Sequence, residues 1–270
     1  MSLQAPAALL ARRELVVVAV TLVALARLVD RADALVVAVL LPVAVLLAGV
    51  TALRGDGRAP VESLLVPAVL TGGAGAALQL VPAGLWLVPA LGLFAIGIDR
   101  VLALEIRLLA QPTSTSDADR ARVLAAAVVT AFVAFTGVAA LVPGGLPEPG
   151  VSGADAGLTE GSILVLALGD ALVALVLGYR VAIARYGAPR DAIRSAVTYA
   201  IVIAVAAGAL RAIDVPRLVG PAALTLVFYL WDALHATAPD RRREPRFLWE
   251  TILLGVLAIV VVAWNLRLRV

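Results

Sequence analysis

The stretch "SILVLALGDALVALVLGYRVAIA", residues 162–184, decides the fold class. A helix that crosses a membrane needs about 20 mostly apolar residues, because each residue advances the helix by about 1.5 Å. This stretch meets that requirement and contains a single carboxylate, that of Asp170, in an apolar setting. It therefore predicts a transmembrane helix, and it raises the question of what an acid does inside one.

The composition of the whole chain agrees with this stretch. Hydrophobic residues make up 62% and charged residues 15% of the 270 positions, with a mean hydropathy of +1.02. Soluble domains carry about 45–50% apolar and about 25% charged residues. The sequence therefore predicts an all-α, polytopic integral membrane helix bundle whose main partner is the lipid bilayer.

The charge distribution and the absence of cysteine exclude some classes of binding partner and site. All 22 basic residues are arginine, and the net charge is +3. The arginines lie in short connections between apolar runs instead of on one basic face, so we expect no nucleic-acid partner. The chain has no cysteine, which excludes disulfides and thiolate metal sites.

Cutting the chain at charges, prolines and glycines predicts nine spans within a single transmembrane domain over residues 1–270. The first follows the basic "ARRE" and could be read as a secretory signal, but "ARLVDRADA" places charges where a cleavage site needs small neutral residues. We therefore keep it as a span. The nine predicted spans are 14–29, 34–53, 61–81, 84–104, 121–142, 162–184, 194–213, 216–236 and 247–266.

The arginines also predict the orientation. With a cytoplasmic N-terminus, the inner connections contain 16 of the 22 arginines and the outer connections and C-terminus contain 6. Arginine excess marks cytoplasmic loops. The longest outer loop, 143–161, has three acids and no base. We expect a multi-pass protein of the plasma (inner) membrane, with the N-terminus inside and the C-terminus outside.

Weak internal similarity predicts a tandem duplication. Asp33 aligns with Asp170 in "DAL" segments at an offset of 137, and Asp99 aligns with Asp232 at an offset of 133. The matches predict two repeat halves, 14–104 and 121–236, with the span 247–266 appended. Identities are common in sequence rich in Ala, Val and Leu, so coincidence is the alternative.

Asp170 is the main candidate intramembrane polar site. A carboxylate at the centre of a membrane helix raises the free energy of insertion by about 2.5–3.5 kcal/mol, so such a residue is expected to have a function. The structural alternative is a pair with an arginine such as Arg27 or Arg211, or exposure to a water-filled crevice. Asp99 is predicted at the inner end of its span, and its side chain is a further candidate.

A second candidate lies at the inner end of the eighth span. Asp232 and His235 are three residues apart, so they share a helix face and could form a proton-relay pair. The alternative is an interfacial anchor, because aromatic residues flank them. The basic segment that follows predicts a topology signal and a contact for anionic headgroups, formed by Arg241, Arg242, Arg243 and Arg246.

Small residues in "TGGAGAA", residues 71–77, predict close helix packing at Gly73 and Ala77. No metalloprotease, nucleophile-elbow or phosphate-loop motif is present, and no carboxylate cluster has metal-ligand spacing. We therefore expect no enzyme activity and no cofactor. Two functions remain: an accessory or scaffold subunit packed against other membrane-protein subunits, or a small-solute or proton-coupled transporter that uses Asp170 and the Asp232–His235 pair.

Overall fold

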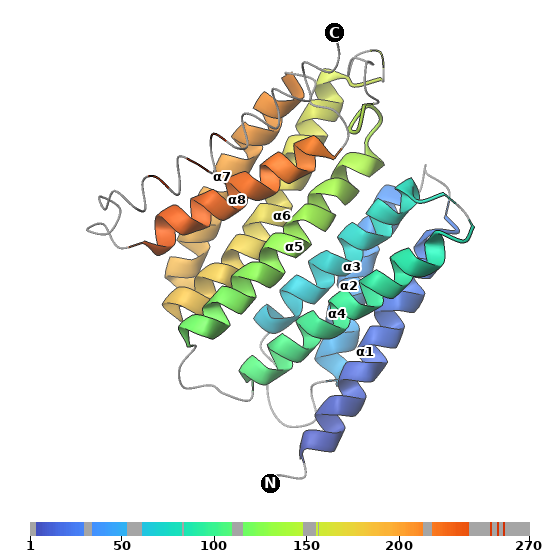
Figure 1. Cartoon of the computed structure of the whole chain (residues 1–270), viewed down its shortest axis with the longest axis vertical. Helices are drawn as coiled ribbons and strands as arrows, with labels where there is room; N and C mark the ends of the chain where they lie inside the picture. The colour runs from blue at the N-terminus through green and yellow to red at the C-terminus, as the bar shows by residue number, and fades with distance from the viewer. Residues whose placement is uncertain are drawn as a thin grey trace.

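The chain folds into a bundle of α-helices (Figure 1). The computed structural model describes residues 4–29, 34–52, 61–82, 84–109, 116–147, 155, 157–212, 218–237, 249, 253 and 256. These residues contain no strand. The helices are α1 (Gln4–Ala26), α2 (Ala34–Ala52), α3 (Leu65–Ala77), α4 (Leu87–Leu109), α5 (Asp117–Leu141), α6 (Glu160–Tyr186), α7 (Pro189–Ala212) and α8 (Val219–Ala236), and the short 3-10 helices η1 (Val61–Leu64) and η2 (Leu78–Leu80) extend α3 at its two ends.

Six of these helical segments are long and apolar enough to cross a membrane: the η1–α3–η2 unit and α4 to α8. They match six of the nine predicted spans. The apolar part of α2, 36–52, is shorter, and α1 carries Arg12, Arg13 and Glu14. The predicted span 247–266 lies outside the described residues except at positions 249, 253 and 256. The protein is thus a helical, membrane-type bundle, and the count of nine spans stays a prediction.

The helix ends differ from the predicted ones where charges were taken as breaks. The helix α1 begins at Gln4, ten residues before the predicted start, and it includes the "ARRE" segment. The turn between α6 and α7 follows the local sequence closely. Gly187 adopts φ +68° and ends α6, and Pro189 opens α7. Glycine tolerates this left-handed conformation, and proline suits the first position of a helix.

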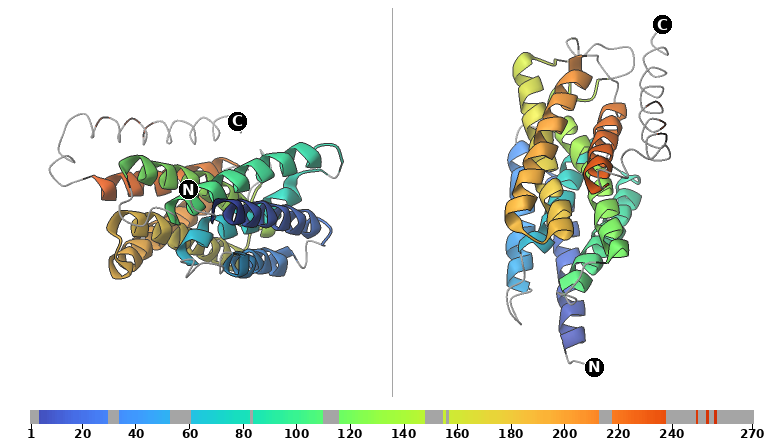
Figure 2. Two further views of the ribbon diagram at one scale, coloured as in Figure 1. Left: turned by 90° about the horizontal axis from the view of Figure 1, so that it is seen from below. Right: turned by 90° about the vertical axis from the view of Figure 1, so that its left-hand side faces the viewer.

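The helices form two groups of four with the same order of neighbours. In the first group α1 packs on α2, α2 on α3, α3 on α4 and α4 on α1, and the second group repeats this order from α5 to α8. Figure 2 shows the two groups side by side along the bundle. This order agrees with the predicted 4 + 4 repeat, but superposition of the halves stays a prediction.

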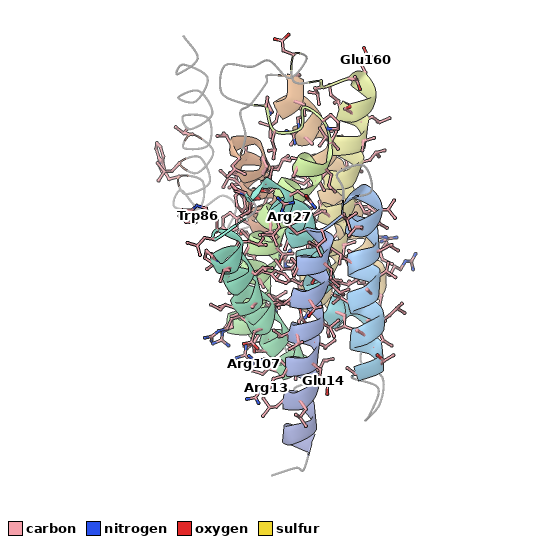
Figure 3. All side chains as sticks on the ribbon, turned by 90° about the vertical axis from the view of Figure 1, so that its right-hand side faces the viewer. Arg13, Glu14, Arg27, Trp86, Arg107 and Glu160 are labelled. Atoms are coloured by element: carbon pink, nitrogen blue, oxygen red, sulfur yellow. The ribbon has the colours of Figure 1, made fainter. Side chains whose placement is uncertain are left out.

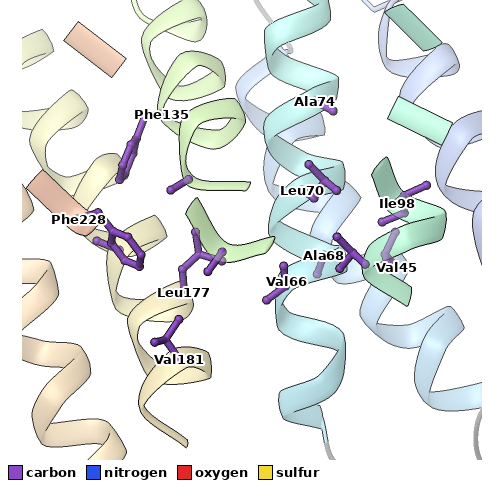
Figure 4. Packing of buried hydrophobic residues seen from close by; sticks show 14 of the residues in the cluster. Val45, Val66, Ala68, Leu70, Ala74, Ile98, Phe135, Leu177, Val181 and Phe228 are labelled. Atoms are coloured by element: carbon purple, nitrogen blue, oxygen red, sulfur yellow. The ribbon is translucent and has the colours of Figure 1, made fainter. Parts of the chain in front are cut away.

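Apolar side chains fill both groups. In the second group, Phe135, Leu177 and Phe228 are fully buried between α5, α6 and α8, and in the first group Val66 and Ile98 are fully buried (Figure 4). Large apolar residues also cover the outer helix faces, which suits contact with lipid.

The two groups meet mainly where α3 packs on α5. A Cβ atom on Gly73 would lie 2.6 Å from Ala134 Cα, and one on Gly137 would lie 2.5 Å from the Gly73 carbonyl oxygen. Only glycine allows the two backbones to approach this closely. The predicted close packing at Gly73 is therefore confirmed, and it joins the two halves.

Candidate functional site

Asp170 lies in the interior of α6, ten residues after the helix starts at Glu160. At 1.5 Å per residue this is about 15 Å along the helix. The side chain is completely buried, and neither carboxylate oxygen has a hydrogen-bond partner among the described residues. An unpartnered buried carboxylate is costly, so Asp170 differs from every other acid in the bundle described below.

The positive charge that acts on Asp170 is Arg211, near the end of α7. Its guanidinium is buried and donates from Nη1 to the Gly145 carbonyl oxygen at 2.5 Å. Its Nε and Nη2 atoms have no partner in the described part of the chain. The two side chains interact electrostatically but form no ion pair within 4.0 Å. Of the two predicted partners, Arg211 is therefore the nearby one, while Arg27 donates to the Val81 carbonyl oxygen at 3.3 Å.

A second buried pair joins the two halves. Arg180 of α6 donates from Nε and Nη2 to the two carboxylate oxygens of Glu105 in α4, at 3.0 and 2.6 Å. The two side chains are only 7% and 3% exposed. Two parallel bonds between a guanidinium and a carboxylate are the strongest form of this contact. The sequence did not predict this pair, because Glu105 lies one residue past the predicted span 84–104 and Arg180 was assigned to an inner connection.

Asp232 of α8 is the centre of a third polar cluster. Its Oδ1 atom accepts from Arg185 Nη2 at 2.6 Å and from the Tyr199 hydroxyl at 2.5 Å. His235 is not bonded to Asp232: its Nδ1 atom is 3.0 Å from the Trp231 carbonyl oxygen, and its ring lies against the Trp231 ring at 4.5 Å between centroids and the Tyr199 ring at 6.4 Å, tilted in both cases. The structure thus brings Asp232 to Arg185 and Tyr199, and places His235 in an aromatic cluster.

Asp99 of α4 accepts hydrogen bonds from Arg12 of α1, one of them from Nε at 2.8 Å. These side chains are 37% and 25% exposed, so this pair is more exposed than the Glu105–Arg180 and Asp232–Arg185 pairs. Asp33 and the arginines 241–246 lie outside the described residues. The described residues contain no group of three His, Asp or Glu side chains that could hold a metal ion.

A long groove runs between α3, α4 and α5, with a volume of about 930 Å³. Its walls are almost entirely apolar, and its charged lining residues are Arg100, Arg107 and Arg122. Arg107 and Arg122 donate to Asp119 Oδ1 at 2.8 and 2.9 Å. Figure 3 shows Arg107 toward the end of the bundle where Arg13 of α1 also lies. The sequence did not predict this groove, because residues of three separate helices form its walls.

Comparison of the chain with protein-family models, with curated proteins and with solved structures found no match. The assignment of function therefore depends on the geometry of the helical membrane bundle itself.

Proposed function

We propose that the protein is a non-catalytic accessory or scaffold subunit of a membrane complex, in the plasma membrane with its N-terminus in the cytoplasm. The observation that carries the proposal is the buried Glu105–Arg180 pair, which joins α4 of the first half to α6 of the second. A scaffold holds a fixed shape while other subunits pack on it. Interhelical ion pairs and glycine contacts suit that role.

The same contacts oppose the movement that a transporter needs. Alternating access requires one half to rock or shift against the other around a central site. Here such movement would separate Glu105 from Arg180 and disturb the Gly73–Gly137 contact. Breaking a buried ion pair costs about 3–5 kcal/mol when it leaves an uncompensated charge. The ion pair and the glycine contact therefore favour a rigid bundle over one whose halves move.

Purification from native membranes at the natural expression level tests the proposal. The expected result is a complex in which identified membrane proteins are present in fixed stoichiometry with this chain after gentle detergent extraction. Isolation of the chain alone, together with solute or proton flux after reconstitution, would overturn it.

Crosslinking sharpens that test, because the chain has no cysteine of its own. The hydroxyl of Tyr179 in α6 lies 3.4 Å from Glu62 in η1, so cysteines at these two positions can be joined by a short bis-maleimide across the halves. We expect the crosslinked protein to assemble with its partners as the uncrosslinked protein does. A flux that the crosslink blocks would instead show that the halves move.

A proton-coupled transporter is the second candidate, and Asp170 is the observation that favours it. This carboxylate is completely buried without a hydrogen bond in the described residues, and the charge of Arg211 acts on it. Such a group could exchange a proton and bias a conformational equilibrium. Asp232 contributes less to this candidate, because Arg185 and Tyr199 hold it, and His235 is bonded elsewhere.

Substitution of Asp170 separates the two candidates. For a scaffold, we expect Asp170→Asn to leave expression, folding and complex assembly unchanged, because the amide keeps the shape and removes a charge that lacks a close partner. Asp170→Ala controls for loss of polarity. Proton flux into reconstituted vesicles that disappears in Asp170→Asn, with folding intact, would favour the transporter.

A further inference from the structure

We propose that the groove between α3, α4 and α5 is a binding site for an anionic membrane lipid, with the headgroup at the arginines and an acyl chain along the apolar walls. This site is independent of the scaffold assignment, since either candidate function could include it. Three features of the groove favour this ligand: the position of Arg100, the charge of the lining, and the opening of the groove toward lipid.

Arg100 is the feature that calls for a counterion. It is the fourteenth of the 23 residues of α4 and lies toward the inner end of the predicted span 84–104. Its side chain is exposed and has no hydrogen bond or ion pair with another described residue. A guanidinium on the apolar surface of a candidate span is costly unless it reaches water or an anion. The neighbouring acids do not serve it, because Asp99 is held by Arg12 and Glu105 by Arg180.

The lining residues have a net positive charge, and they include three arginines and no acid. Asp119 compensates part of this charge by accepting from Arg107 and Arg122. Those two side chains remain 44% and 57% exposed, so their other donors are accessible. Guanidinium groups bind phosphate through paired hydrogen bonds. The positive charge of the lining therefore complements a phosphate headgroup. It disfavours a partner helix that has few acidic residues.

The rest of the groove fits a hydrocarbon chain. Its volume of about 930 Å³ is at the upper end of the range of about 300–1,000 Å³ for sites that bind small molecules. Leu93 of α4 and Val129 of α5 line it and are 72% and 62% exposed, so it opens sideways on the face that contacts lipid. The predicted orientation places the arginines toward the cytoplasmic leaflet, where anionic lipids attract basic residues.

Two substitutions test the headgroup and the chain separately. Arg100→Gln removes the unpaired charge and leaves the Asp119 contacts intact. Gly97→Leu fills the groove without changing charge, because Gly97 lines it and a Cβ there meets no atom within 4 Å. Each has a matched control: Arg190→Gln removes an exposed arginine at the start of α7, and Gly92→Leu adds the same side chain at an unobstructed position of α4 outside the lining.

The measurement is native mass spectrometry of the delipidated full chain in neutral detergent, titrated with phosphatidylglycerol, phosphatidylcholine or inorganic phosphate. We expect preferential binding of phosphatidylglycerol, about fivefold weaker in Arg100→Gln and at least tenfold weaker in Gly97→Leu, with both controls unchanged. Equal binding of both lipids, equal loss in Arg190→Gln, or no effect of Gly97→Leu would overturn the site. Full competition by inorganic phosphate would show an anion site without a lipid chain. Crosslinking of Gly97→Cys to residues 247–266 would show that the chain itself fills the groove.

Discussion

The Glu105–Arg180 pair gives the sharpest test of how this bundle is held together. Both side chains are almost fully buried, at 3% and 7% exposure, and two hydrogen bonds join them. We expect Glu105→Leu alone, or Arg180→Met alone, to lower the free energy of unfolding by about 3–5 kcal/mol, because each leaves one buried charge without its partner. The double variant Glu105→Leu/Arg180→Met should recover most of that loss, since apolar pairs of similar volume often replace buried ion pairs without net cost.

The free energies are measured by titration with SDS in mixed micelles, with the folded fraction followed by circular dichroism. The Arg12–Asp99 pair is the internal comparison, because its side chains are 25% and 37% exposed. Exposed pairs contribute about 0–1 kcal/mol, so Asp99→Asn should change stability by less than 1 kcal/mol. Single variants of Glu105 and Arg180 that each cost under 1 kcal/mol, or that add without coupling in the double variant, would refute the reasoning.

Two further predictions concern packing and orientation. Gly73→Ala should destabilise the protein by about 1–3 kcal/mol in the same SDS titration, because the added Cβ would overlap Ala134. Gly92→Ala should have no such cost, because a Cβ there meets no atom within 4 Å. Equal effects of the two changes would contradict the α3–α5 contact. Ser152→Cys in the predicted outer loop should react with an impermeant maleimide added outside intact cells, and labelling only after the inner side is opened would reverse the predicted orientation.

Hydropathy alone predicted most of the helical regions. The span predicted at 162–184 is the helix Glu160–Tyr186, and the one predicted at 121–142 is Asp117–Leu141. Long apolar runs locate helices because backbone groups in a membrane must bond within their own segment. The ends were less predictable. Charged residues mark where apolar character stops, but α1 runs through "ARRE", and Arg12 within it is held by Asp99 of α4.

The polar contacts were far less predictable than the helices. Glu105 and Arg180 are 75 residues apart, and nothing in either local sequence specifies the other as partner. The Asp232–His235 spacing gave a plausible local pair, but a shared helix face does not fix which neighbour a side chain meets. Asp232 reaches Tyr199 and Arg185 on two other helices, while His235 remains beside Trp231 in its own helix. Tertiary packing determines which side chains Asp232 and His235 contact, and the periodicity of the sequence does not predict that packing.

Asp170 is the opposite case, because the sequence identified it, and among the buried acids that the structure describes it is the one whose carboxylate has no hydrogen bond. The acids Glu105 and Asp232 each accept from an arginine of α6, the helix that also carries Asp170. Asp170 faces Arg211 without a bond, and the Gly145 carbonyl takes the Nη1 donor of that arginine. If α6 had only a structural role, pairing Asp170 with an arginine as well would give a more stable fold, since burying an unpartnered carboxylate costs more free energy than burying a hydrogen-bonded one. The choice between scaffold and transporter therefore depends on Asp170 and Arg211. A stabilised, fully assembled Asp170→Asn variant would mean that the bundle tolerates this charge without using it.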